Sequence, residues 1–109
     1  MATKGPEAKV KEAIRQQLNS LGHDCWWYMP VAGPFAVAGI PDFVGIYKGK
    51  GFGIEAKAEN GKVTAHQKRQ LGMIAAAKGF SIIVRGVEDA RLVASMLRVW
   101  AGESQEGGA

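Results

Sequence analysis

Residues 39–57 read GIPDFVGIYKGKGFGIEAK, and this segment decides the fold of the chain. Two runs of strand-forming residues are separated by glycines and lysines, which predicts a β-hairpin with a tight turn. Because successive side chains of a strand point to opposite faces, Glu55 and Lys57 lie on one face of the second strand. The other face is expected to point into a core and carries Phe52, Ile54, Ala56 and Ala58.

The register of this hairpin decides where Asp42 lies, at the start of the first strand. A turn centred between Gly49 and Lys50 places Asp42 opposite Lys57. Directly opposed residues share a face of the sheet, so Asp42, Glu55 and Lys57 are predicted to converge on one patch. A one-residue shift in the turn is expected to send Asp42 to the far side.

Length and composition narrow the class of protein. The 109 residues suffice for one compact domain, and 47% hydrophobic residues argue against disorder. No apolar run has membrane-spanning length, and the N-terminus lacks the apolar segment of a signal peptide. Cys25 is the single cysteine, which excludes an internal disulfide and a multi-cysteine zinc site. These features predict an intracellular, cytoplasmic protein without a membrane partner or a small-molecule cofactor.

The rest of the chain alternates helical and strand patterns. Apolar residues spaced by four, four and three predict a helix that starts at Pro6 and ends at Gly22. Strands are expected over 25–29 and 81–85, and a last helix from Glu88, with tails at 1–5 and 102–109. The order helix, strand, hairpin, helix, strand, helix predicts an α/β sandwich with a mixed sheet. The apolar loop 30–41 either contacts a ligand or packs against a second subunit.

The helix after the hairpin has a recognisable start. Thr64 is followed three residues later by Gln67, which matches a capping box after the turn-like segment 58–63. Leu71 lies one turn further along the helix. Gln67 is therefore expected on the inward side of the helix, together with Leu71, Ile74 and Ala75.

Two carboxylates on one face repel each other, and a cation between them relieves that repulsion. Hard oxygen ligands suit Mg²⁺ or Mn²⁺, and the carbonyl of Ala56 is a reasonable further ligand beside Asp42 and Glu55. Lys57 would orient an attacking water or offset negative charge on phosphorus. This set suits phosphodiester hydrolysis. The alternative is a surface ion pair between Lys57 and Asp42 across the two strands.

The ordered combination Ile40-Pro41-Asp42, Glu55-Ala56-Lys57 and Gln67 resembles the VRR-NUC domain of the PD-(D/E)xK nuclease superfamily. The resemblance runs from about Pro6 to about Val87. It implies a restriction-endonuclease-like αβββαβα sandwich with a central mixed sheet flanked by helices. It also implies metal-dependent DNA cleavage, with Glu7, Asp42 and Glu55 around the metal, and Lys57 and Gln67 as further catalytic residues.

The chain departs from the family pattern at residues 35–38, where related nucleases often carry a basic residue before Pro-Asp. Small stand-alone members of the family resemble Holliday-junction resolvases, which implies a structure-selective homodimer and suits a phage origin. Two alternatives stay open. One is a non-catalytic DNA-binding dimer with the same fold, and the other is a less selective DNA or RNA nuclease.

Basic and aromatic side chains fit a DNA partner without establishing one. The net charge is +4 and the pI is about 9.4, but many basic proteins bind no nucleic acid. The candidate phosphate contacts, expected near the site, are Lys48, Lys50, Lys62, Lys68 and Arg69. For each of them the alternative is a solvated surface. The aromatic run Trp26-Trp27-Tyr28 either stacks on bases or belongs to the core.

Overall fold

The computed structural model describes residues 5–103 and contains one four-stranded sheet. The strands lie in the order of the chain: β1 (Cys25–Tyr28), β2 (Phe43–Tyr47), β3 (Lys50–Lys57) and β4 (Phe80–Arg85). The β1–β2 and β2–β3 pairs are antiparallel, and the β3–β4 pair is parallel. The predicted mixed sheet is confirmed.

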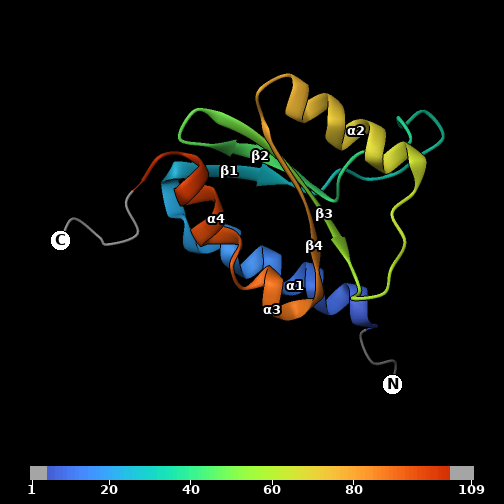
Figure 1. Cartoon of the computed structure of the whole chain (residues 1–109), viewed down its shortest axis with the longest axis horizontal. Helices are drawn as coiled ribbons and strands as arrows, with labels where there is room; N and C mark the ends of the chain where they lie inside the picture. The colour runs from blue at the N-terminus through green and yellow to red at the C-terminus, as the bar shows by residue number, and fades with distance from the viewer. Residues whose placement is uncertain (1–4, 104–109) are drawn as a thin grey trace.

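Helices cover both faces of this sheet (Figure 1). The helices are α1 (Pro6–Ser20), α2 (Ala65–Ala76), α3 (Gly86–Ala90) and α4 (Val93–Trp100), and a short 3₁₀ helix, Gly22–Asp24, follows α1. On one side lie α1, α3 and α4, whereas α2 alone lies on the other side (Figure 1). The element order and layers are those of the predicted αβββαβα sandwich. No helix within residues 5–103 is both long and apolar enough to cross a membrane.

The core fills the layer between α1 and the sheet. The stripe Val10, Ile14 and Leu18 on α1 is fully buried, as its helical spacing predicts. It packs in one cluster with Phe43, Phe52, Ile54 and Ala56 from the same sheet face. Burial of side chains of this size stabilises the fold by roughly 1.5–3 kcal/mol each. The inward face predicted for β3 is therefore confirmed for the residues within the strand.

The last helix differs from its prediction. Instead of one helix from Glu88, the chain forms α3 and α4, with a break at Arg91 and Leu92. The amide of Leu92 donates to the carbonyl of Asp89, a tighter turn than the α-helix uses. Both short helices contact α1, so packing against α1 outweighs continuation of one straight helix. Leu92 is exposed at this break.

The hairpin turn also differs from its prediction. Tyr47 pairs with Lys50, so the turn is centred between Lys48 and Gly49, one residue earlier than expected. Both turn residues have positive φ, +49° and +83°, which is the type I′ geometry favoured in two-residue hairpins. Moving the turn centre by one residue moves each cross-strand partner by two, so the expectation that a one-residue shift in the turn sends Asp42 to the far side is wrong. The register, continued past Phe43, therefore places Asp42 opposite Glu55 instead of Lys57, on the face that was predicted.

The predicted tails fall mostly outside the described residues, at 1–4 and 104–109. Glu103, counted with the C-terminal tail, is tied to the hairpin. Its carboxylate accepts a hydrogen bond from the hydroxyl of Tyr47 and lies 3.0 Å from Nζ of Lys48.

Candidate active site

Glu55 is the most deeply buried charged side chain among the described residues, with 3% of its surface exposed. It lies on β3, on the sheet face that α2 covers. Its Oε2 accepts a hydrogen bond from Nε2 of Gln67 at 2.9 Å and lies 3.6 Å from Nζ of Lys57. Its Oε1 is buried without any hydrogen-bond partner. An unpaired buried carboxylate oxygen is costly, so a bound cation or water would stabilise it.

Asp42 precedes β2 and meets Glu55 from the neighbouring strand. Its Oδ2 accepts a hydrogen bond from the backbone N–H of Ala56 at 2.9 Å, and its side chain is 21% exposed. The N–H and C=O of one strand residue point to the same side. The carbonyl of Ala56 therefore also faces the Asp42 side, beyond the last β2–β3 pair at Phe43 and Ile54. Asp42 is partly exposed at this open end of the hairpin, whereas Ala56 is fully buried.

Gln67 joins the start of α2 to the acids. The Thr64 hydroxyl accepts from the backbone N–H of Gln67, and the Gln67 side-chain oxygen accepts from the backbone N–H of Thr64. The predicted capping box is confirmed. The amide nitrogen of the same side chain is left free to donate to Glu55. One glutamine thus fixes both the helix start and the orientation of the buried carboxylate.

Gly39 presses the loop before Asp42 against the start of α2. Its φ is +82°, a conformation that favours glycine. A Cβ at this position would lie 2.3 Å from the backbone carbonyl of His66 and 2.6 Å from the amide nitrogen of Gln67. Because no side chain fits there, loop and helix approach closely enough to bring Asp42 and Gln67 to the same site.

The electrostatics of the acid pair favour a bound cation. Burial, followed by the negative charge of Asp42, raises the pKa of Glu55 to about 7, while Lys57 acts in the opposite direction. The partnerless Oε1, the neighbouring carboxylate and the nearby carbonyl form a set of hard oxygen donors. The residues present therefore fit Mg²⁺ or Mn²⁺.

Glu7 stands apart from this pair. Its exposed side chain lies 3.5 Å from Nζ of Lys11, and Lys11 in turn lies 3.6 Å from Oδ1 of Asp42. Within residues 5–103 no group of three or more acids, histidines or cysteines gathers closely enough to hold a metal. The three-acid cluster that the resemblance implies is not assembled in this structure, because a lysine lies between Glu7 and Asp42. The role of Glu7 stays a prediction.

The sequence pattern did not single out Lys11. Its signal was its spacing, four residues after Glu7, which places both side chains on one side of α1. The structure brings this lysine to Asp42 from a separate element. Lys11 thus brings a positive charge to Asp42, where the segment 35–38 supplies none.

The five candidate DNA contacts fall into two groups. Lys68 and Arg69 follow Gln67 on the first turn of α2 and are exposed, and Lys62 is exposed in the loop before it. Lys48 and Lys50 lie at the hairpin turn, about 17–20 Å along β2 from Asp42. The expectation that these two lie near the site is wrong, because the turn closes one end of the hairpin and the acids occupy the other. Lys48 is also paired with Glu103.

The aromatic run of β1 is divided between the two sheet faces. Trp27 packs on Phe43 with ring centroids 5.8 Å apart and belongs to the core layer. Trp26 and Tyr28 point the other way and remain 62% and 50% exposed. Their rings lie 5.5 Å apart. The core alternative is therefore confirmed for Trp27, whereas base stacking by the exposed Trp26 and Tyr28 stays a prediction.

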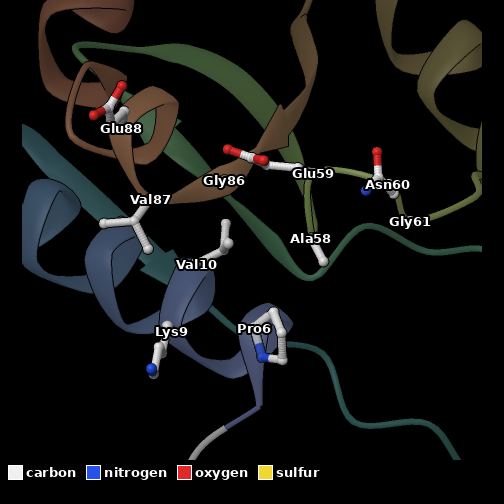
Figure 2. A pocket seen from close by; sticks show the side chains of 10 residues that line it. All are labelled: Pro6, Lys9, Val10, Ala58, Glu59, Asn60, Gly61, Gly86, Val87 and Glu88. Carbon is white, nitrogen blue, oxygen red and sulfur yellow. The ribbon is translucent and has the colours of Figure 1, made fainter.

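A separate cleft of about 530 Å³ lies near the ends of α1, β3 and β4 (Figure 2). Its lining combines residues of α1 with Ala58, the residue directly after Lys57, and its neighbours, and it includes none of Asp42, Glu55, Lys57 and Gln67. Lys9 and Glu88 point away from each other, and Glu59 reaches toward Gly86 (Figure 2). Two acids and one lysine give this cleft a negative balance. It is a poor receptor for phosphate and is not the site of the converging acids.

Comparison with known proteins bears on the fold. No protein-family model matches the sequence, and no curated protein matches it. A solved structure described as a VRR_NUC domain protein superposes with a TM-score of 0.66 at 20% sequence identity. The match covers 90% of this chain and 92% of that one. The chain therefore has the fold of a VRR-NUC domain, with Asp42, Glu55 and Lys57 brought together on one face of its sheet.

Proposed function

We propose that this protein is a divalent-metal-dependent nuclease of the PD-(D/E)xK type that hydrolyses phosphodiester bonds in DNA. The observation that carries the proposal is the buried, partnerless Oε1 of Glu55 beside a second carboxylate and a buried lysine. Perturbed acids that converge with a lysine at a solvent-accessible edge are typical of catalytic sites. The likeness to a solved VRR_NUC domain protein supports the same reaction class.

In this proposal Asp42, Glu55 and the carbonyl of Ala56 hold Mg²⁺ or Mn²⁺. The bound ion supplies Lewis-acid activation of a phosphate oxygen and of water. Asp42 is positioned by its hydrogen bond from Ala56, and Glu55 by Gln67. Glu7, next to Lys11 on α1, contributes only weakly and through water.

Lys57 has a different task from the acids. Its ammonium group is largely buried and lies 3.6 Å from Glu55, so its position is fixed before substrate arrives. It donates to the attacking water or to the phosphate, which stabilises negative charge as the bond breaks. Lys62, Lys68 and Arg69 surround the opening and bind neighbouring phosphates, which positions the DNA without reading its sequence.

Structure selectivity and a homodimer with two active sites extend the proposal to branched DNA, where two strands are cut. The rival is a non-catalytic DNA-binding protein with the same fold, in which the lysine and acids form a structural ion-pair cluster. A second rival is a nuclease that also cuts RNA or single strands. The site geometry favours catalysis because a purely structural cluster would pair the Glu55 oxygen that is left open here.

The test is cleavage of labelled four-way junction, flap, duplex, single-stranded DNA and single-stranded RNA in Mg²⁺, Mn²⁺ or EDTA. We expect products from DNA only with a divalent ion. Lys57→Ala should lower the rate at least about 100-fold. The matched control Lys9→Ala removes an exposed lysine of α1 and should leave the rate unchanged. DNA binding without products under every condition would favour the non-catalytic rival.

A further inference from the structure

A groove of about 820 Å³ opens on the sheet face shared with the acids, between the hairpin and the C-terminal end of α2. Gly51 of β3 is exposed on its floor and leaves open space there. It is lined by, among others, Trp26, Ile46, Lys50, Gly51, Ile74 and Lys78. Helix α2 covers β3 and β4 but leaves β1 and β2 open on this face (Figure 1).

The groove leads toward the proposed catalytic site. Trp26 pairs with Ile46, and Tyr28 pairs with Val44, so these side chains share one face. Val44 lines the groove, and Asp42 occupies the next position on the same face, about 7 Å further along the chain. The exposed rings of Trp26 and Tyr28 therefore form a path from the groove to the acids.

The charge of the groove selects its occupant. Within the described part of the chain, its lining residues include Lys50 and Lys78 and no acid. Nζ of Lys50 lies 5.5 Å from the centroid of the Trp100 ring at the hairpin end of the groove. A second copy of this chain would bring the same lysines into an isologous contact without a carboxylate to pair them. A polyanion that carries flat rings matches both the positive charge of the groove and its exposed aromatic side chains.

We propose that this groove binds an unpaired, single-stranded segment of DNA, whose bases stack on Trp26 and Tyr28 and whose phosphates contact Lys50 and Lys78. Exposed aromatic rings beside a positively charged groove are the combination that holds single strands. Binding of a single strand does not require cleavage, and only the substrate preference that follows from it rests on the proposed nuclease function. It makes DNA with an unpaired segment next to the scissile phosphate the preferred substrate, in contrast to blunt duplex.

Gly51 offers a sharp test because it lies on the groove floor. A Cβ there would meet only the carbonyl oxygen of Gly45, at 3.9 Å, so a side chain fits without a clash. Gly51→Glu places a negative charge in the groove, and Gly51→Lys is the matched control of similar length and opposite charge. We expect Gly51→Glu to weaken binding of fluorescent oligo-dT in EDTA at least tenfold, whereas Gly51→Lys keeps or tightens it.

The stacking and phosphate contacts have separate signatures. Trp26→Ala should weaken oligo-dT binding at least about fivefold, and Trp26→Phe should restore most of it. Lys50→Gln combined with Lys78→Gly should reduce the salt dependence of log K by about 1.4, the value for two single-strand phosphate contacts. Lys78→Gly removes the charge at a φ of +72°, which glycine adopts freely.

The outcomes separate this inference from the nuclease proposal, because binding is measured without cleavage. Unchanged oligo-dT affinity in Gly51→Glu and Trp26→Ala, with thermal melting like the parent protein, overturns the groove whether or not the protein cuts DNA. Loss of a dimer by sedimentation in these variants, with DNA affinity unchanged, assigns the surface to a second copy and also overturns it. Loss of affinity in a protein that never cuts would keep the groove and reject the nuclease.

Discussion

The two faces of β3 bury their side chains for opposite reasons. Ile54 and Glu55 are neighbours in sequence and both are buried, one against α1 and the other beneath α2. Ile54 gains free energy by leaving water, whereas Glu55 loses it, since one of its carboxylate oxygens has no partner. The comparison teaches that one face holds the fold together and the other stores an unfavourable arrangement that a ligand can relieve.

Substitutions at Ile54 and at Glu55 should show the largest difference between the two faces in their effects on stability and cleavage. Glu55→Gln is expected to lower cleavage at least about 100-fold while changing the free energy of unfolding much less than Ile54→Ala does, because relief of the buried charge offsets the lost ion pair with Lys57. Ile54→Ala is expected to lower the free energy of unfolding by about 2–5 kcal/mol through a cavity. Urea unfolding and cleavage rates measure both. Comparable destabilisation by the two variants would contradict the comparison.

The pH dependence of stability tests the same strain. The pKa of Glu55 is raised to about 7 from an ordinary value of 4.5, so the folded state binds more protons than the unfolded state between these values. Without metal, stability from this group is therefore full below about pH 4.5 and is lost as the pH rises through 7. Urea midpoints in EDTA should show this fall in the parent protein and not in Glu55→Gln.

A divalent ion should reverse that loss. Bound at Asp42 and Glu55, Mg²⁺ or Mn²⁺ favours the charged carboxylate, so it should raise the melting temperature more at pH 8 than at pH 5. Glu55→Gln should respond to neither ion. An equal rise at both pH values in both proteins would place metal binding elsewhere.

Gln67 joins the start of α2 to Glu55 on the sheet face that α2 covers. Its substitution should have an effect of intermediate size on cleavage and stability. Gln67→Ala removes half of the capping box and the hydrogen bond to Glu55, so we expect a loss of about 1 kcal/mol in stability and about 10–100-fold in cleavage. Thr64→Ala is the matched control, since it removes the other half of the cap and leaves the amide that faces Glu55. Equal loss of cleavage in both variants would reduce Gln67 to a helix cap.

Glu7 should give the smallest effect. The Glu7 side chain is exposed on α1 and pairs with Lys11. We therefore expect Glu7→Gln to change cleavage less than about threefold and the free energy of unfolding by about 0.3–0.5 kcal/mol. A loss of 100-fold or more would show that the metal-bound protein draws Glu7 into the site. Helix α1 would then contribute to the acid site as well as to the core face of the sheet.

Much of the fold and part of the site followed from local patterns. The apolar spacing on α1, the alternation along β3 and the Thr64–Gln67 cap all depend on neighbouring residues, and all three appear as predicted. The face of Asp42 was also correct, although its partner is Glu55 instead of Lys57. Asp42 stayed on the predicted face because moving the turn by one residue shifts each cross-strand partner by two, and residues two apart in a strand share a face.

By itself the sequence determined the order of elements, the residues of the inner face, and the meeting of two acids and a lysine at one end of a hairpin. Only the tertiary structure decided where the last helix breaks, that Trp27 packs half-buried against the core while Trp26 is exposed, and that Lys11 stands between Glu7 and Asp42. The physical reason is the separation along the sequence over which each effect acts. Periodicity and capping act within a few residues, whereas exposure and ion pairing depend on which distant element packs against a side chain.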